Sequence, residues 1–105
     1  MKVLITAPCL GAFGGMEAFC LRLTAHLVEE ENFEVRLAFR KVDGFILKDS
    51  LRDAVANSAC ETKILSKGAK ELSSLVRWAD LVHGHNPSIS PVLLAKRHRK
   101  PCVLT

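Results

Sequence analysis

The sequence predicts an α/β fold, a doubly wound parallel sheet of the Rossmann-like kind, and two observations lead to it. Short apolar runs typical of buried strands alternate along the chain with stretches whose apolar residues recur at helical spacing. The connections between them are short, and such alternation builds right-handed βαβ units with helices on both faces of one sheet. The chain has 105 residues, which supports one domain at most.

The first half of the chain predicts two strands, each followed by a helix. Residues 2–6 are an apolar run and predict a short buried strand. Residues 16–30 carry a helical stripe, made up of Met16, Phe19, Cys20, Leu23 and Leu27. Residues 33–39 alternate between apolar and polar side chains, which predicts a strand, and a short helix is expected at 49–57. We expect the first strand to be central, with the second beside it.

The second half continues the alternation. A strand is expected at residues 61–66, and residues 69–79 have apolar side chains at helix spacing. Residues 80–85 predict a strand that runs into a turn. A serine followed by proline marks the start of a helix at 90–99, and residues 101–105 begin a fifth strand.

Composition and charge exclude several classes of protein. The four cysteines lie far apart with no C-x-x-C pair, so we expect reduced thiols and neither a zinc site nor a disulfide framework. No apolar run approaches the roughly 20 residues of a membrane helix, and no targeting signal is visible, so a cytoplasmic location is expected. No basic stripe interleaves with aromatic residues, which argues against nucleic acid as a partner.

The net charge of +4 comes from one short run near the end of the chain. Without Lys96, Arg97, Arg99 and Lys100, the remaining basic and acidic side chains would cancel. Cations at the end of a helix are favoured by the helix dipole, which is one explanation of the run.

A glycine-rich stretch, TAPCLGAFGGMEAF, follows the first expected strand. Gly11, Gly14 and Gly15 leave bare backbone N–H groups at a helix N-terminus, an arrangement that suits a phosphate. The glycines also suit a turn that needs positive φ, so a flexible corner remains the alternative. Glu17 competes for the same N–H groups, which favours a partial phosphate contact over an enclosed one.

The glycine spacing differs from a dinucleotide fingerprint, because G-x-x-G-G is not G-x-G-x-x-G. No acidic residue ends the second expected strand to hold a ribose. Arg40 and Lys41 stand there instead, and they suit either a 2′-phosphate or an ordinary solvated loop. An NADP-binding Rossmann domain of an oxidoreductase therefore remains an alternative.

A second polar cluster is the sequence HGHNP, residues 83–87. In a strand, His83 and His85 point to the same side, and Asn86 follows at the carboxyl end of the strand. No third metal ligand accompanies the pair, so we expect no metal. His85 is expected to contact a hydroxylated ligand, and His83 to be an interior side chain.

Two segments together resemble a known family. The G-G-x-E element at 14–17 and the later stretch ADLVHGHNPSISPVLLAKRHRKPCVLT resemble the N-terminal domain of glycosyltransferase family 4, which has the GT-B fold. The resemblance implies an enzyme that transfers a sugar from a nucleotide-sugar donor to the hydroxyl of a sugar or lipid-linked acceptor. Residues 1–105 would be the acceptor-side fragment of this enzyme, because the donor-binding C-terminal domain is absent.

The resemblance also implies roles for individual residues. Gly14, Gly15 and Glu17 would form the loop beside the donor phosphates, and His85 and Asn86 would line the acceptor side. It implies no cofactor and places the catalytic carboxylates in the absent domain, so the fragment is expected to be inactive alone. The basic run near the C-terminus would suit peripheral contact with an anionic membrane. A non-catalytic binding module remains a further alternative.

Overall fold

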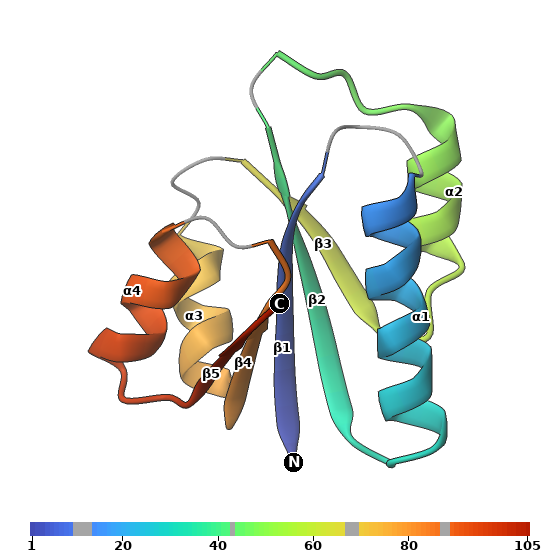
Figure 1. Ribbon diagram of the computed structural model, residues 1–105. Helices are drawn as coiled ribbons and strands as arrows, with labels where there is room; N and C mark the ends of the chain where they lie inside the picture. The colour runs from blue at the N-terminus through green and yellow to red at the C-terminus, as the bar shows by residue number, and fades with distance from the viewer. Residues whose placement is uncertain (10–13, 43, 67–69, 87–88) are drawn as a thin grey trace.

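The computed structural model describes residues 1–9, 14–42, 44–66, 70–86 and 89–105, and strands and helices alternate along them (Figure 1). The strands are β1 (Lys2–Cys9), β2 (Glu34–Lys41), β3 (Glu61–Leu65), β4 (Leu81–Gly84) and β5 (Cys102–Leu104). The helices are α1 (Gly15–Glu29), α2 (Asp49–Ala56), α3 (Glu71–Trp78) and α4 (Ile89–Arg97). None of the helices in these ranges has the length and apolar character that crossing a bilayer requires.

The strands form one parallel sheet in the order β3-β2-β1-β4-β5. Helices α1 and α2 cover one face of the sheet, and α3 and α4 cover the other (Figure 1). The predicted fold class is confirmed, as are the central first strand and its pairing with β2. Most of the expected boundaries lie within two residues of the observed ones, but β1 continues to Cys9 because it pairs with β2 as far as Lys41.

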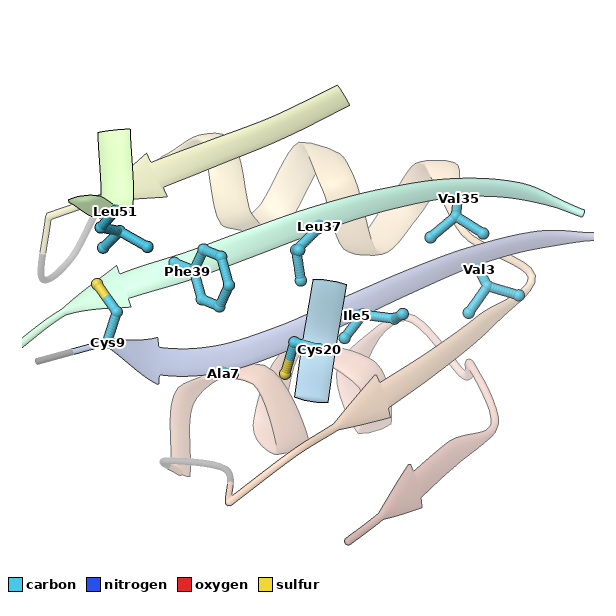
Figure 2. Close-up of a cluster of buried hydrophobic side chains, with 9 residues drawn as sticks. All are labelled: Val3, Ile5, Ala7, Cys9, Cys20, Val35, Leu37, Phe39 and Leu51. Atoms are coloured by element: carbon cyan, nitrogen blue, oxygen red, sulfur yellow. The ribbon is translucent and has the colours of Figure 1, made fainter. Parts of the chain in front are cut away.

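The face covered by α1 and α2 is densely packed, and we call it the α1/α2 face. Odd-numbered residues of β1 and β2 point to it because strand side chains alternate. Figure 2 shows these side chains meeting in one cluster between the sheet and the two helices. Its buried members are Val3, Ile5, Ala7, Cys9, Cys20, Val35, Leu37, Phe39 and Leu51.

The opposite face, which we call the α3/α4 face, has a core of smaller residues. Five of its eight buried members are alanine or valine: Leu4, Ala38, Leu65, Leu75, Val76, Ala79, Val82 and Ala95. The even-numbered residues of β1 and β2 supply its floor. This face therefore has less side-chain volume with which to fill the space between sheet and helices.

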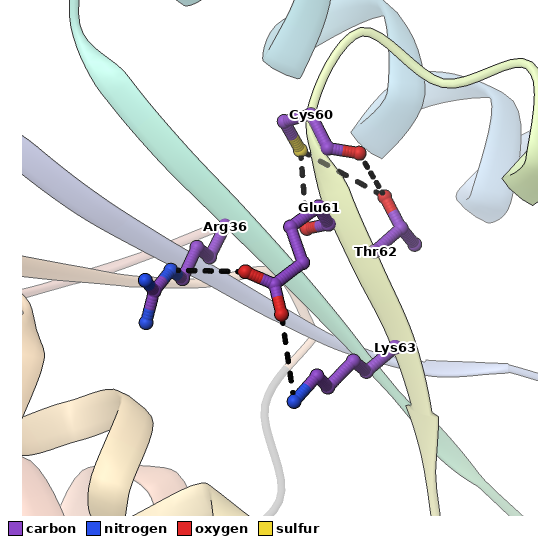
Figure 3. Close-up of polar contacts among 5 residues, drawn as sticks. All are labelled: Arg36, Cys60, Glu61, Thr62 and Lys63. Carbon is purple, nitrogen blue, oxygen red and sulfur yellow. Dashed lines mark hydrogen bonds and ion pairs between the residues drawn. The ribbon is translucent and has the colours of Figure 1, made fainter.

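Charged side chains lie along the edge strand β3 (Figure 3). Arg36 of β2 pairs directly with Glu61, at 3.2 Å from Nε to the carboxylate, and Lys63 lies 3.4 Å from the same carboxylate. The Arg36 guanidinium also lies 4.2 Å above the Trp78 ring of α3. Because these ion pairs are about half exposed they add little stability, but charges on an edge strand discourage pairing with another chain.

Candidate functional site

A cavity of about 380 Å³ opens on the α3/α4 face, at the carboxyl ends of β1, β2 and β3. Its walls come from the first turns of α3 and α4. Its lining is mainly apolar, with four hydroxyl side chains and one arginine: Thr6, Ala7, Pro8, Ala38, Phe39, Arg40, Leu65, Ser66, Leu72, Ser73, Ser90, Pro91, Leu93 and Leu94.

Three adjacent strands form the floor of the cavity. Thr6 of β1 pairs with Ala38 of β2, and Arg40 of β2 pairs with Leu65 of β3. Directly opposite residues of parallel strands share a face, so these side chains belong to the α3/α4 face. Thr6 and Ala38 are small and adjacent, and the space above them is left open.

The hydroxyl of Thr6 has no hydrogen-bond partner among the described residues, although the residue is only 4% exposed. A buried hydroxyl without a partner costs about 1–3 kcal/mol of stability. Thr6 also lines the cavity, so a molecule bound there would contact this residue. Ser73 differs, because its Oγ lies 3.4 Å from Nε2 of His98.

Arg40 is the charged residue in the cavity lining, and the described residues offer it no ion pair. Arg36, four positions earlier on the same face of β2, is paired with Glu61 and Trp78. Lys41, the other cation named for a 2′-phosphate, is exposed and does not line the cavity. Of these two cations, Arg40 therefore lines the cavity and Lys41 does not.

Sequence reasoning missed Thr6 and Ala38. They carry no recognisable motif, and an unfilled volume is a property of the packed structure. One signal was present in the sequence: small residues lie near the C-terminal ends of the expected strands 2–6 and 33–39, on the face opposite to Ile5 and Leu37.

The expected phosphate loop lies only partly within the described residues, because Gly11 falls outside them. Gly14 has an extended backbone, with φ −112°, and both Gly14 and Gly15 are exposed at the start of α1. Glu17 is 3% exposed, and its Oε1 would lie 3.6 Å from a Cβ added at Gly14. A carboxylate thus occupies the helix N-terminus, where it would repel an anion. Contact of these glycines with a phosphate stays a prediction.

The histidines of HGHNP point to the same side, as predicted. His83 Nε2 and His85 Nδ1 each lie 3.1 Å from the hydroxyl oxygen of Thr105. Because one hydroxyl donates only one proton, the other hydrogen bond needs a protonated ring nitrogen as donor. Burial, and secondly the neighbouring His85, lower the pKa of His83 below its ordinary value of 6.5.

The proposed acceptor residues contact α1. The ring of His85 stacks on Phe19 with centroids 4.6 Å apart, and Asn86 Nδ2 lies 3.8 Å from Sδ of Met16. They follow the carboxyl end of β4 and are not among the residues that line the cavity. Their contact with a ligand stays a prediction.

The basic run forms the end of α4. Arg99 has φ +54°, its N–H bonds to the carbonyl of Lys96, and the N–H of Lys100 bonds to the carbonyl of Ala95. These two bonds are those of a Schellman motif, which closes a helix and is more often built with glycine at the position of Arg99. The run thus has a structural role at the helix C-terminus, and its contact with a membrane stays a prediction.

No family model and no curated protein matches this chain. Its fold is similar to the crystal structure of a protein from the universal stress protein family from Burkholderia pseudomallei, with 14% sequence identity and a TM-score of 0.49. The match covers 97% of this chain and 94% of that one. At this identity the similarity concerns the fold alone.

These findings correct the resemblance to glycosyltransferase family 4. No family model supports it, and the structural similarity lies with the universal stress protein family. The interpretation of the chain as the acceptor-side domain of a nucleotide-sugar-dependent GT-B enzyme is therefore wrong, and so is the NADP-binding oxidoreductase alternative.

The residues that carried the resemblance have structural explanations. In G-G-x-E, the acidic residue is buried against the start of α1. In the later segment, Val82 is core, and His83 and His85 bind the Thr105 hydroxyl. Strands, turns and helix starts of a parallel α/β sheet place similar residues at similar points, so two short motifs reflected the fold rather than a family.

Proposed function

We propose that this chain is a binding module for a small, mainly apolar molecule, which it holds in the cavity on the α3/α4 face. The observation that supports the proposal is an apolar cavity of about 380 Å³ lined by Thr6, whose buried hydroxyl has no partner among the described residues. Small-molecule sites have this character: mainly apolar walls, a few polar groups and volumes of roughly 300–1,000 Å³.

The energetics favour an occupant. Protein interiors are close-packed, and an unfilled space loses the contacts that its lining atoms would otherwise make. A buried hydroxyl without a partner lowers the free energy of unfolding by about 1–3 kcal/mol, and the total for a domain is only about 5–15 kcal/mol. A ligand with an apolar body and a polar group would recover both losses.

The position in the fold also favours binding. The cavity lies at the carboxyl ends of the strands, the edge at which parallel α/β sheets collect their ligands. Leu93, which is exposed, lines it from α4 and offers apolar surface at its entrance.

Calorimetric titration with decan-1-ol, a neutral amphipath, tests the proposal. We expect saturable binding of one molecule per chain, and we expect Ala38→Leu to abolish it because the larger side chain fills the floor of the cavity. Ala56→Leu is the matched control, since Ala56 is exposed on α2 beyond the opposite face. Leu94→Phe replaces Ala38→Leu if circular dichroism shows that the latter is unfolded. Absence of saturable binding to the wild-type chain, or equal binding by Ala38→Leu, would contradict the proposal.

A further inference from the structure

We infer that the ligand of this cavity is an amphipathic monoanion, with an apolar body among the leucines and a carboxylate held by Arg40 and the hydroxyl of Thr6. The inference rests on the proposed function and adds the charge of the ligand and the residues that recognise it.

The charge of the cavity wall is the first argument. Arg40 is the one ionised side chain among the described lining residues, and no carboxylate is among them. Arg36 shows how the same strand neutralises an arginine, with Glu61 at 3.2 Å and the Trp78 ring at 4.2 Å. Arg40 has neither kind of partner in the described chain. An arginine beside an apolar cavity without a counter-ion is suited to a ligand that brings one.

The helices add to the positive potential. The cavity is bordered by Leu72 and Ser73 in the first turn of α3, and by Ser90 and Pro91 in the first turn of α4. Helix N-termini carry partial positive charge and favour anions. The carboxylate of Glu71 also lies in the first turn of α3, but it is exposed and does not line the cavity.

Thr6 provides the independent second observation. Its hydroxyl is buried, has no partner in the described residues and belongs to a cavity-lining residue. Thr6 is opposite Ala38, and Arg40 lies two positions further along β2, toward the carboxyl edge. An extended arginine side chain spans the separation between two alternate residues of a strand. One carboxylate can therefore accept hydrogen bonds from the Arg40 guanidinium and the Thr6 hydroxyl.

The residues also limit the charge of the ligand. One arginine lines the cavity and no lysine joins it among the described residues, whereas a doubly charged phosphate would need further cations or an enclosing set of backbone donors. The leucine-rich remainder, Leu65, Leu72, Leu93 and Leu94, suits an alkyl or similar apolar body. A single carboxylate on an apolar body matches both features.

The test compares decanoate, decan-1-ol and decylammonium by calorimetric titration at pH 7.5. We expect decanoate to bind about tenfold or more tightly than decan-1-ol, the size of effect that a hydrogen bond to a charged group gives. Decylammonium is expected to bind most weakly. Arg40→Gln should remove the preference for decanoate over decan-1-ol, and Thr6→Val should weaken the binding of decanoate several-fold.

Two matched variants serve as controls. Arg22→Gln removes an exposed arginine of α1. Thr24→Val removes a second buried hydroxyl that has no partner among the described residues and that lies on α1, not in the cavity. Both should bind decanoate as the wild-type chain does. Equal affinity for decanoate and decan-1-ol, or a preference that survives Arg40→Gln, would overturn this inference and leave the proposed function intact. Failure of all three probes to bind would overturn both.

Discussion

The two faces of the sheet differ in how they are filled. At the carboxyl end of the α1/α2 face, Phe39 packs with Cys9 and Leu51, and all three are fully buried. At the same level of the α3/α4 face the strands present Thr6 and Ala38, and a cavity lies above them. The same two strands build both surfaces, so the cavity results from the choice of small residues at alternate positions. One face is a structural core, and the other combines a core with a binding site.

The largest expected effect is on the packed face. Phe39→Ala should lower the free energy of unfolding by about 3–5 kcal/mol, because a large ring leaves a filled site. Leu72→Ala, at a half-buried position beside the existing cavity, should lose at most about half as much, since fewer contacts are broken. Urea denaturation followed by circular dichroism measures both. Equal losses would show that the two faces are packed alike.

The next effect concerns the buried hydroxyls. Thr6→Val should raise the free energy of unfolding by about 1–2 kcal/mol, because it removes a buried polar group that has no partner among the described residues. Thr24→Val should stabilise α1 for the same reason. The same urea titration tests both variants. Decanoate binding distinguishes them, because Thr6→Val should weaken it and Thr24→Val should not. A Thr6→Val variant less stable than wild type would mean that the hydroxyl is satisfied.

Protonation should act on the α1/α2 side, where His83 shares the Thr105 hydroxyl with His85. The folded chain holds the pKa of His83 below 6.5, so the unfolded chain takes up the proton first as the pH falls. The free energy of unfolding should therefore be unaffected by this group well above pH 6.5 and decrease as the pH falls through 6.5 and then through the lower folded pKa. Thermal melts between pH 8 and 5 measure this, and His83→Gln should flatten the profile in that range. A wild-type slope unchanged by the substitution would contradict the account.

The smallest effect is on thiol reactivity. Cys9 and Cys20 are buried on the α1/α2 face, and burial together with the charge of Glu17 raises the pKa of Cys20 to about 11. Cys60 and Cys102 are only partly buried. Under native conditions a disulfide reagent should modify these two first, and Cys20 should react only on unfolding. Mass spectrometry of the labelled peptides reads the order, and early labelling of Cys20 would show that α1 opens readily.

The sequence was sufficient for the fold because strand and helix periodicities are local properties. It was less reliable for α1, where the expected apolar stripe included Phe19. The residues buried on α1 are Glu17, Cys20 and Thr24. Phe19 is 39% exposed, and its ring stacks on that of His85. Small side chains let the helix approach the sheet closely, and this selection depends on packing against β1 and β2.

The candidate site was not predictable for a different reason. Arg40 was noticed because of its charge, and it was assigned to a 2′-phosphate since its neighbours in space were unknown. Thr6 became informative only when its hydroxyl proved to be buried without a partner. The G-G-x-E motif, in contrast, led to a wrong family assignment, because the same residue types also occur in the turns and helix starts of other parallel sheets.

The most direct test of the difference between the faces is methyl NMR during a titration with decanoate. The account predicts saturable shifts for Thr6, Leu65 and Leu94, which line the cavity, and none for Ile5, Leu37 and Leu51, which fill the opposite core. Shifts centred on Ile5, Leu37 and Leu51, or no saturable shift at all, would contradict it.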